Sequence, residues 1–184
     1  GFFGVTPYQA VSQYVLGHNG AYGRLGEGDR PLTTPQHLAY VKIAEGCDHR
    51  CTFCAIPGFR GAYVSRPPQD IENEVRRLIE RGVREIALIA QDTTAYGRDS
   101  GGACSLSGLL HRLDCIDGLE WIRSLCAHPA YVTDDLIDVM ARSDHVCAYL
   151  DMPLQHADDR LLRTMGRKQT RADIEALIDR LRNR

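Results

Sequence analysis

From residue 39 onward the chain alternates between short apolar segments and longer segments with apolar residues on one helical face. The short segments have the length of strands and are residues 39–44, 83–90, 119–127 and 145–154. Helical periodicity follows them in residues 71–82, 106–116, 133–143 and 170–181. Strands that alternate with helices in this way are parallel and covered by the helices. A closed eight-stranded barrel needs ~250 residues, so the chain predicts an α/β fold with an open sheet or a partial (β/α) barrel of about four units.

The first 38 residues differ from the rest in their glycine content. They carry seven of the 17 glycines, four of them in the stretch GAYGRLGEG. Glycine at this density interrupts both helical and strand periods. We therefore expect residues 1–38 to be the end of a preceding unit plus a linker, and residues 39–184 to be the core domain. The chain begins with Gly1 and stops inside a predicted helix, which suggests a piece of a longer protein.

The composition is typical of a globular protein, with 25% charged residues, 43% hydrophobic residues and a net charge of −2. This charge gives no electrostatic reason to expect binding to nucleic acid or to a membrane. No apolar run approaches the ~20 residues that cross a bilayer. Seven cysteines, an odd number, indicate reduced thiols rather than a disulfide framework. We expect a cytoplasmic protein.

Polar residues follow each predicted strand at its carboxyl end. They are the cysteine run that follows residue 44, Gln91–Thr94, His128–Pro129 and Asp151–His156. Ligand sites in parallel α/β folds lie at this edge of the sheet. The four loops are therefore predicted to form one site.

The first of these loops, GCDHRCTFCAIPGFRG, holds Cys47, Cys51 and Cys54. A structural zinc site with His49 as fourth ligand is one interpretation, although zinc sites usually add a second, distant C-x-x-C pair that this sequence lacks. A ferredoxin-type cluster needs a fourth cysteine. Three thiolates can instead hold three irons of a cubane cluster and leave the fourth iron open, as catalytic centres do.

The spacing C-x₃-C-x₂-C after the first strand resembles the radical S-adenosylmethionine (radical SAM) superfamily. EGCDHRCTFCAIPGFRG, VSRP, AQDTTAYG and LDMPLQHADDRLLRTMGR together resemble the methylthiotransferase family, over about residues 31–184. The resemblance implies a radical SAM partial barrel that is incomplete at its carboxyl end. It also implies a [4Fe–4S] cluster, with S-adenosylmethionine on the open iron and an electron donor such as flavodoxin or ferredoxin. A second [4Fe–4S] cluster and a target-binding barrel are expected only in a full-length protein.

The resemblance also implies roles for individual residues. Cys47, Cys51 and Cys54 match the cluster ligands, and Phe53 matches an aromatic residue that faces the adenine. Gln91 and Asp92 match positions near the methionyl end of the cofactor, and Gln155 is a further candidate contact. Alternatively, Phe53 shields the cluster, and Gln91 or Asp92 caps the next loop. No side chain is predicted as a catalytic acid or base, because a 5′-deoxyadenosyl radical formed from the cofactor would abstract the hydrogen.

The resemblance is closest to the branch that adds a methylthio group to the β-carbon of an aspartate in the twelfth protein of the small ribosomal subunit. A tRNA-adenosine branch of the same family is the alternative, but its runs generally resemble QNVNxYG and PLQSG, where this chain has QDTTAYG and PLQHA. A non-enzymatic, zinc-stabilised binding module is the alternative from another class.

The remaining features are expected to be structural. Free cysteine packs as a small apolar group, so the four other cysteines are predicted to be buried; they are Cys104, Cys115, Cys126 and Cys147. The basic stretch from Arg160 to Arg171 is interspersed with aspartates and is predicted to be a solvated helix face rather than a nucleic-acid contact. His37, His128 and His156 are expected to be hydrogen-bonded loop residues.

Overall fold

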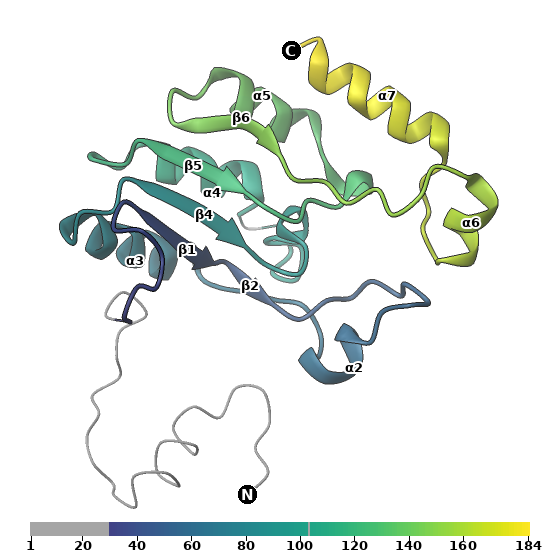
Figure 1. Cartoon of the computed structure of the whole chain (residues 1–184), viewed down its shortest axis with the longest axis horizontal. Coiled ribbons are helices and arrows are strands. Elements are labelled where there is room, and N and C mark those ends of the chain that lie inside the picture. The colour runs from purple at the N-terminus through teal and green to yellow at the C-terminus, as the bar shows by residue number, and fades with distance from the viewer. Residues whose placement is uncertain (1–29, 103) are drawn as a thin grey trace, which may run out of the picture.

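The computed structural model describes residues 30–102 and 104–184 (Figure 1). Its main sheet contains β1 (Leu38–Lys42), β4 (Glu85–Ile89), β5 (Trp121–Ser124) and β6 (Val146–Leu150), in the spatial order β1-β4-β5-β6. Every neighbouring pair is parallel. The predicted α/β class and parallel order are thus confirmed. The predicted unit at residues 1–38 lies almost wholly outside the described residues, so that domain boundary stays a prediction.

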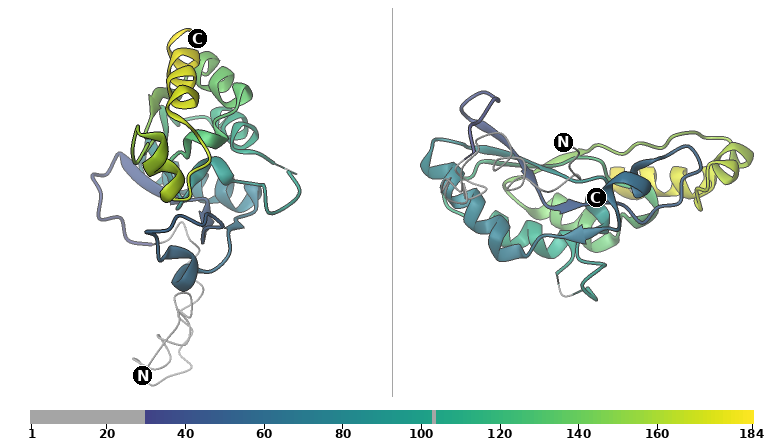
Figure 2. Two further views of the ribbon diagram at one scale, coloured as in Figure 1. Left: turned by 90° about the vertical axis from the view of Figure 1, so that its right-hand side faces the viewer. Right: turned by 90° about the horizontal axis from the view of Figure 1, so that it is seen from below.

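Helices connect the strands and cover one face of the sheet (Figure 2). They are α3 (Pro68–Glu80), α4 (Leu106–Asp114) and α5 (Asp134–Arg142), and α7 (Arg171–Arg182) lies beyond them. Two predicted helix starts are confirmed. The Thr133 side chain accepts a hydrogen bond from the Leu136 N–H, and Thr170 forms a capping box with Asp173. Such caps satisfy backbone N–H groups that have no partner inside the helix.

The two faces of the sheet differ in their burial. Under the helices lie fully buried apolar side chains: Ala39, Val41, Ile86, Leu88 and Ile122. The alternate residues of the strands point the other way, and Tyr40, Trp121 and Tyr149 on that face are 44–52% exposed. Successive strand residues face opposite sides, so the described chain has a core on one side of its sheet only.

Several short elements were not predicted. They are the antiparallel pair β2 (Ala44–Glu45) and β3 (Val64–Ser65), the helices α2 (Ile56–Arg60) and α6 (Asp159–Thr164), and the 3₁₀ turns Thr93–Ala95 and Pro129–Tyr131. None is long enough to show a full apolar period. All of them lie in the segments that surround the cysteine loop. These segments therefore have more regular structure than the sequence indicated.

The prediction that four cysteines are buried is wrong. Cys115 and Cys126 are exposed, and Cys104 and Cys147 are half-buried. Cys126 lies beyond the end of β5 with a φ of 60°, and Cys115 ends α4. Cys147 follows Val146, a buried residue, and so points toward the uncovered face of the sheet. Their positions at element ends and on the open face explain their exposure.

Candidate functional site

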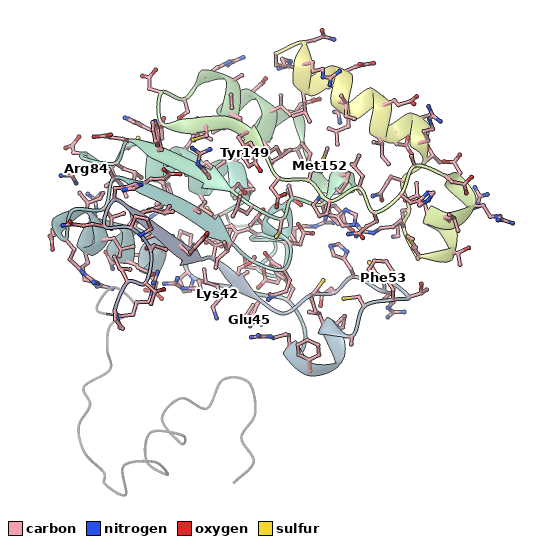
Figure 3. All side chains as sticks on the ribbon, viewed as in Figure 1. Lys42, Glu45, Phe53, Arg84, Tyr149 and Met152 are labelled. Atoms are coloured by element: carbon pink, nitrogen blue, oxygen red, sulfur yellow. The ribbon has the colours of Figure 1, made fainter. Side chains whose placement is uncertain are left out.

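The cysteine loop begins where β2 ends and lies beyond the carboxyl ends of the parallel strands (Figure 3). Cys47, Cys51 and Cys54 are all free thiols. Burial raises the pKa of Cys47, and negative charge on Asp92, Cys54 and Cys51 raises it further. A cation bound beside Cys47 would favour its thiolate form.

Gly46 sets the direction in which the loop leaves the sheet. Its φ is +80°, and a Cβ atom there would lie 2.0 Å from the carbonyl oxygen of Ala62. Next to it, the Cys47 N–H donates to the Gly61 carbonyl at 3.1 Å. Only glycine tolerates both the left-handed backbone and the close approach, so this residue is needed to bring Cys47 into the loop.

Asp92 follows β4 and is 1% exposed. One carboxylate oxygen lies 2.6 Å from His49 Nε2, and the other accepts hydrogen bonds from the N–H and hydroxyl of Thr94 at 2.9 and 2.5 Å. Burial raises the pKa of Asp92, but the hydrogen bonds from His49 and Thr94 outweigh it, and the net pKa lies below its ordinary value. The alternative that Asp92 caps the next turn is confirmed, while its contact with a cofactor stays a prediction.

The His49 ring packs against two other rings. Its centroid lies 4.4 Å from that of His128 and 5.4 Å from that of Tyr131, in stacked geometry. His128 Nδ1 accepts a hydrogen bond from the Ala130 N–H, as expected of a loop residue. Burial, together with the charges of His49 and Arg167, lowers the pKa of His128 to about 4. His128 is therefore neutral near physiological pH.

A second contact joins the cysteine loop to the end of α6. The Thr52 N–H donates to the Met165 carbonyl at 3.1 Å, and the Thr52 hydroxyl donates to the Thr164 carbonyl at 3.0 Å. Gly166 has a φ of +76°, and a Cβ there would lie 2.7 Å from the Arg50 carbonyl oxygen. The segment after β6 is thereby held directly against the segment between Cys51 and Cys54.

Between these contacts lies a cavity of about 340 Å³ whose lining includes Arg50, Cys51, His128 and Arg167. The Arg167 side chain is buried, and its Nε and Nη1 atoms have no hydrogen-bond partner. Buried N–H groups of a charged side chain are costly when they have no partner, and the guanidinium geometry suits a carboxylate or phosphate. The prediction of a solvated face is therefore wrong for Arg167, although its neighbours Arg163 and Lys168 are exposed.

The remaining predicted site residues are Gln91, Phe53 and Gln155. The Oε1 atom of Gln91 is buried without a hydrogen-bond partner and is thus available to a ligand. Phe53 is 55% exposed on the cysteine loop, beyond the end of the sheet (Figure 3). Gln155 is exposed and has a φ of 70°, an uncommon conformation for a residue with a side chain. Strained backbone of this kind is often found at ligand sites.

The residue types in the cysteine loop fit an iron–sulfur cluster, because the loop contains three free thiols and thiolates are the usual ligands of such clusters. No three His, Cys, Asp or Glu side chains within residues 30–102 and 104–184 converge into a ready-made metal site. The assignment of Cys47, Cys51 and Cys54 as ligands thus stays a prediction based on residue type and spacing.

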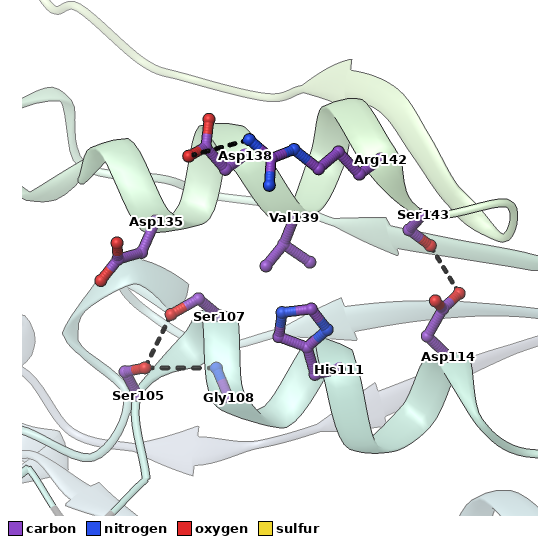
Figure 4. Close-up of a pocket in the computed structure, with 10 residues that line it drawn as sticks. All are labelled: Ser105, Ser107, Gly108, His111, Asp114, Asp135, Asp138, Val139, Arg142 and Ser143. Atoms are coloured by element: carbon purple, nitrogen blue, oxygen red, sulfur yellow. Dashed lines mark hydrogen bonds and ion pairs between the residues drawn. The ribbon is translucent and has the colours of Figure 1, made fainter.

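Another cavity, of about 380 Å³, lies between α4 and α5 (Figure 4). Two of its three carboxylates already have partners, since Asp138 pairs with Arg142 and Asp114 accepts from Ser143 and His145. It lies on the helical layer and contains none of the predicted site residues. This groove is accordingly not a candidate for the cofactor.

The fold and the cysteine loop define a class, namely a parallel α/β protein with three free thiols beyond the carboxyl ends of its strands, where ligand sites in such folds lie. Comparison with known families assigns the chain within that class. It belongs to the radical SAM superfamily, whose family profile matches residues 41–184. Such a protein uses a [4Fe–4S] cluster and S-adenosylmethionine.

Comparison with individual curated proteins shows which members of this superfamily the chain resembles. The chain is 54% identical over 153 residues to the ribosomal protein uS12 methylthiotransferase RimO of Desulforamulus reducens, covering 83% of this chain and 34% of that protein. It is 49% identical over 192 residues to the RimO protein of Geotalea uraniireducens, covering 98% of this chain and 43% of that protein. The chain thus spans less than half the length of these relatives.

Two solved structures are similar to this chain in fold, and their low sequence identity supports no conclusion beyond the fold. The radical S-adenosylmethionine methyltransferase TsrM from Kitasatospora setae matches with a TM-score of 0.62 and 17% identity, over 84% of this chain and 32% of that chain. The cobalamin-dependent radical enzyme OxsB also matches with a TM-score of 0.62, at 11% identity, over 79% of this chain and 22% of that chain. Within the described residues, no helix is both long and apolar enough to cross a membrane.

Proposed function

We propose that this chain is the cluster-binding core of an enzyme that adds a methylthio group to the β-carbon of an aspartate in ribosomal protein uS12. The observation that carries the proposal is the 44–54% identity to relatives named as uS12 methylthiotransferases over 83–98% of the chain. Because the chain spans only 34–44% of those relatives, the sulfur source, the second cluster and the electron donor belong to the proposal for a whole protein.

In this proposal Cys47, Cys51 and Cys54 would hold three irons of the cluster, and the fourth iron would be left open for S-adenosylmethionine. When bound, the cofactor supplies a carbon radical strong enough to attack an unactivated C–H bond, which no protein side chain provides. Phe53, Gln91, Asp92 and Gln155 stay predicted contacts to the cofactor.

Arg167 joins these residues as the partner for an anionic group. Its buried Nε and Nη1 lack a protein partner beside Cys51, and the methionyl part of the cofactor carries a carboxylate. A charge-assisted pair of this kind gives both affinity and orientation. The same carboxylate would then accept hydrogen bonds from the Nε and Nη1 atoms, which the described residues leave without a partner.

Anaerobic reconstitution tests the first half of the proposal. The chain is incubated with iron and sulfide, analysed for metal, then reduced with S-adenosylmethionine and assayed for 5′-deoxyadenosine. Iron, sulfide and 5′-deoxyadenosine are expected, and Cys51→Ala should lose the cluster. Cys115→Ala, at an exposed cysteine outside the loop, is the matched control and should keep it. Tight zinc without iron would support the zinc-stabilised module instead.

The substrate is tested with a whole protein that contains this segment. Ribosomal protein uS12 and tRNA are offered separately, and the products are analysed by mass spectrometry. A methylthio mass gain on uS12 is expected. A gain on tRNA alone would assign the chain to the tRNA-adenosine alternative.

A further inference from the structure

A side-chain hydrogen bond joins the cysteine loop to the carboxyl end of β4. His49 lies in the three-residue gap between Cys47 and Cys51, and its Nε2 atom lies 2.6 Å from the Asp92 carboxylate. Asp92 is 1% exposed. A hydrogen bond to a charged group is stronger away from water than at the surface, so this contact fixes the loop more firmly than an exposed one would.

Tyr63 makes two further hydrogen bonds beside the His49–Asp92 contact. Its N–H donates to Asp48 Oδ1 at 3.0 Å, and its hydroxyl donates to the Asp92 carbonyl at 2.8 Å. His49 is therefore bonded to Asp92 directly, and Asp48 is linked to Asp92 through Tyr63. The second Asp92 carboxylate oxygen is held by Thr94, so the acceptor side of the His49 contact cannot rotate freely.

The stacking of His49 on His128 and Tyr131 restricts the donor side in the same way. His49 is thus bound by its ring nitrogen to the loop after β4 and by its ring face to the loop after β5. Cys51 follows it after a single residue, Arg50. Any rotation of the His49 backbone would displace Cys51.

We propose that His49 and Asp92 form a positioning pair for the cluster, which fixes the peptide between the first two ligands and thereby sets where Cys51 lies relative to Cys47. The inference rests on the proposed function, since it assumes that these thiols hold iron. Neither side chain is a ligand in this arrangement. Substitution of outer-shell partners of metal ligands typically costs about 10–100-fold in metal affinity or activity, so the pair should have a measurable effect on the cluster.

Three variants of the chain separate positioning from general stability. His49→Phe keeps an aromatic ring for the stack but removes the donor to Asp92. His49→Gln replaces the ring nitrogen with an amide N–H at a similar reach. His145→Phe is the matched control, because His145 Nδ1 pairs with Asp114 at 3.0 Å beside the amino end of β6, at the opposite edge of the sheet.

Each variant is reconstituted anaerobically, and the loss of iron to a chelator is followed by absorbance. The electron paramagnetic resonance spectrum of the reduced cluster is recorded with and without S-adenosylmethionine. His49→Phe is expected to lose iron about tenfold faster than the wild type and to show an altered spectrum. His49→Gln should restore most of both properties, and His145→Phe should match the wild type.

The inference is overturned if wild type and His49→Phe lose iron at the same rate with the same spectrum, or if His145→Phe accelerates the loss as much as His49→Phe. A failure of His49→Gln to restore either property would also contradict it, because the donor would then not be what matters. A wild-type chain that takes up no iron would instead refute the proposed function, and the positioning role with it.

Discussion

Arg167 differs from the basic residues around it because its guanidinium is buried while theirs are exposed. The sequence offered no signal for this difference. The segment between α6 and α7 has no helical period, and Gly166 turns it back onto the cysteine loop through a left-handed conformation. Burial of a single side chain in such a segment depends on where the fold places it. Arg167 lines one cavity with Arg50 and Cys51, which lie more than 100 residues away in the chain.

His128 gives a prediction about pH. Its pKa in the folded chain is about 4, below the ordinary value of 6.5, chiefly because of burial. Between these values the unfolded chain binds a proton that the folded chain does not, so stability falls as the pH is lowered from about 6.5 to about 4. With allowance for solvent screening, we expect a loss of about 1–2 kcal/mol in the free energy of unfolding, measured by urea denaturation.

His128→Asn provides the comparison for that experiment. The asparagine side-chain oxygen can still accept the hydrogen bond from the Ala130 N–H, but it does not titrate. Its stability should therefore depend less on pH over the same range. Superimposable pH profiles for the two proteins would show that His128 is not the group responsible.

At the scale of elements, the longer strands and helices were predictable and the short ones were not. The apolar period of α3 and the cap at Thr133 are local signals, and both appear in the structure where expected. The predicted strand at 119–127 shortens to Trp121–Ser124, because Cys126 leaves the extended conformation. β2, β3 and α6 form through contacts with distant segments, and no local period specifies them.

The same limit applies to the candidate site. The three cysteines, Gln91 and Asp92 could be selected from the sequence by their spacing and their place after strands. The pairing of Asp92 with His49 could not, because 43 residues separate them and the carboxylate could equally have faced a ligand. Residue types identify a site, whereas the partners within it depend on the fold.

Arg66 and Glu74 give a prediction for the way β1 is joined to α3. Glu74 on α3 is 2% exposed, and its carboxylate lies 2.8 Å from Arg66 Nη1. The same guanidinium atom donates to the Lys42 carbonyl at the end of β1. Without Arg66 this buried carboxylate keeps, among the described residues, only Arg30, whose Nη2 lies 3.6 Å from its other oxygen. Breaking a buried pair costs about 3–5 kcal/mol, so Arg66→Met should lower the free energy of unfolding by about 3 kcal/mol, the low end of that range.

A double variant tests whether the buried charge is the cause. Arg66→Met combined with Glu74→Leu removes both charges and should be more stable than Arg66→Met alone, since no buried carboxylate is left without its nearer partner. Urea denaturation of the two single variants, the double variant and the wild type forms a complete cycle. Strictly additive losses would mean that the two side chains are not coupled.

At the scale of the whole molecule, helices cover one face of the sheet, and within residues 30–102 and 104–184 no helix covers the other (Figure 2). On the open face, the Arg123 guanidinium lies 5.9 Å from the ring centroids of both Trp121 and Tyr149. Trp121 is 52% exposed and Tyr149 is 50% exposed. Contiguous exposed apolar surface tends to associate, and β6 also presents an edge of the main sheet that no other described strand covers.

We therefore predict that the 184-residue chain self-associates as its concentration rises, through this face. Replacing Trp121 and Tyr149 together with threonine keeps strand propensity while removing the aromatic surface, and it should shift association to higher concentration. Phe59→Thr is the matched control, because Phe59 is 55% exposed but lies on α2 beside the cysteine loop. Sedimentation velocity over a concentration series measures the effect. If the control weakens association as much as the double variant, or the double variant leaves it unchanged, the open face of the sheet is not the surface responsible.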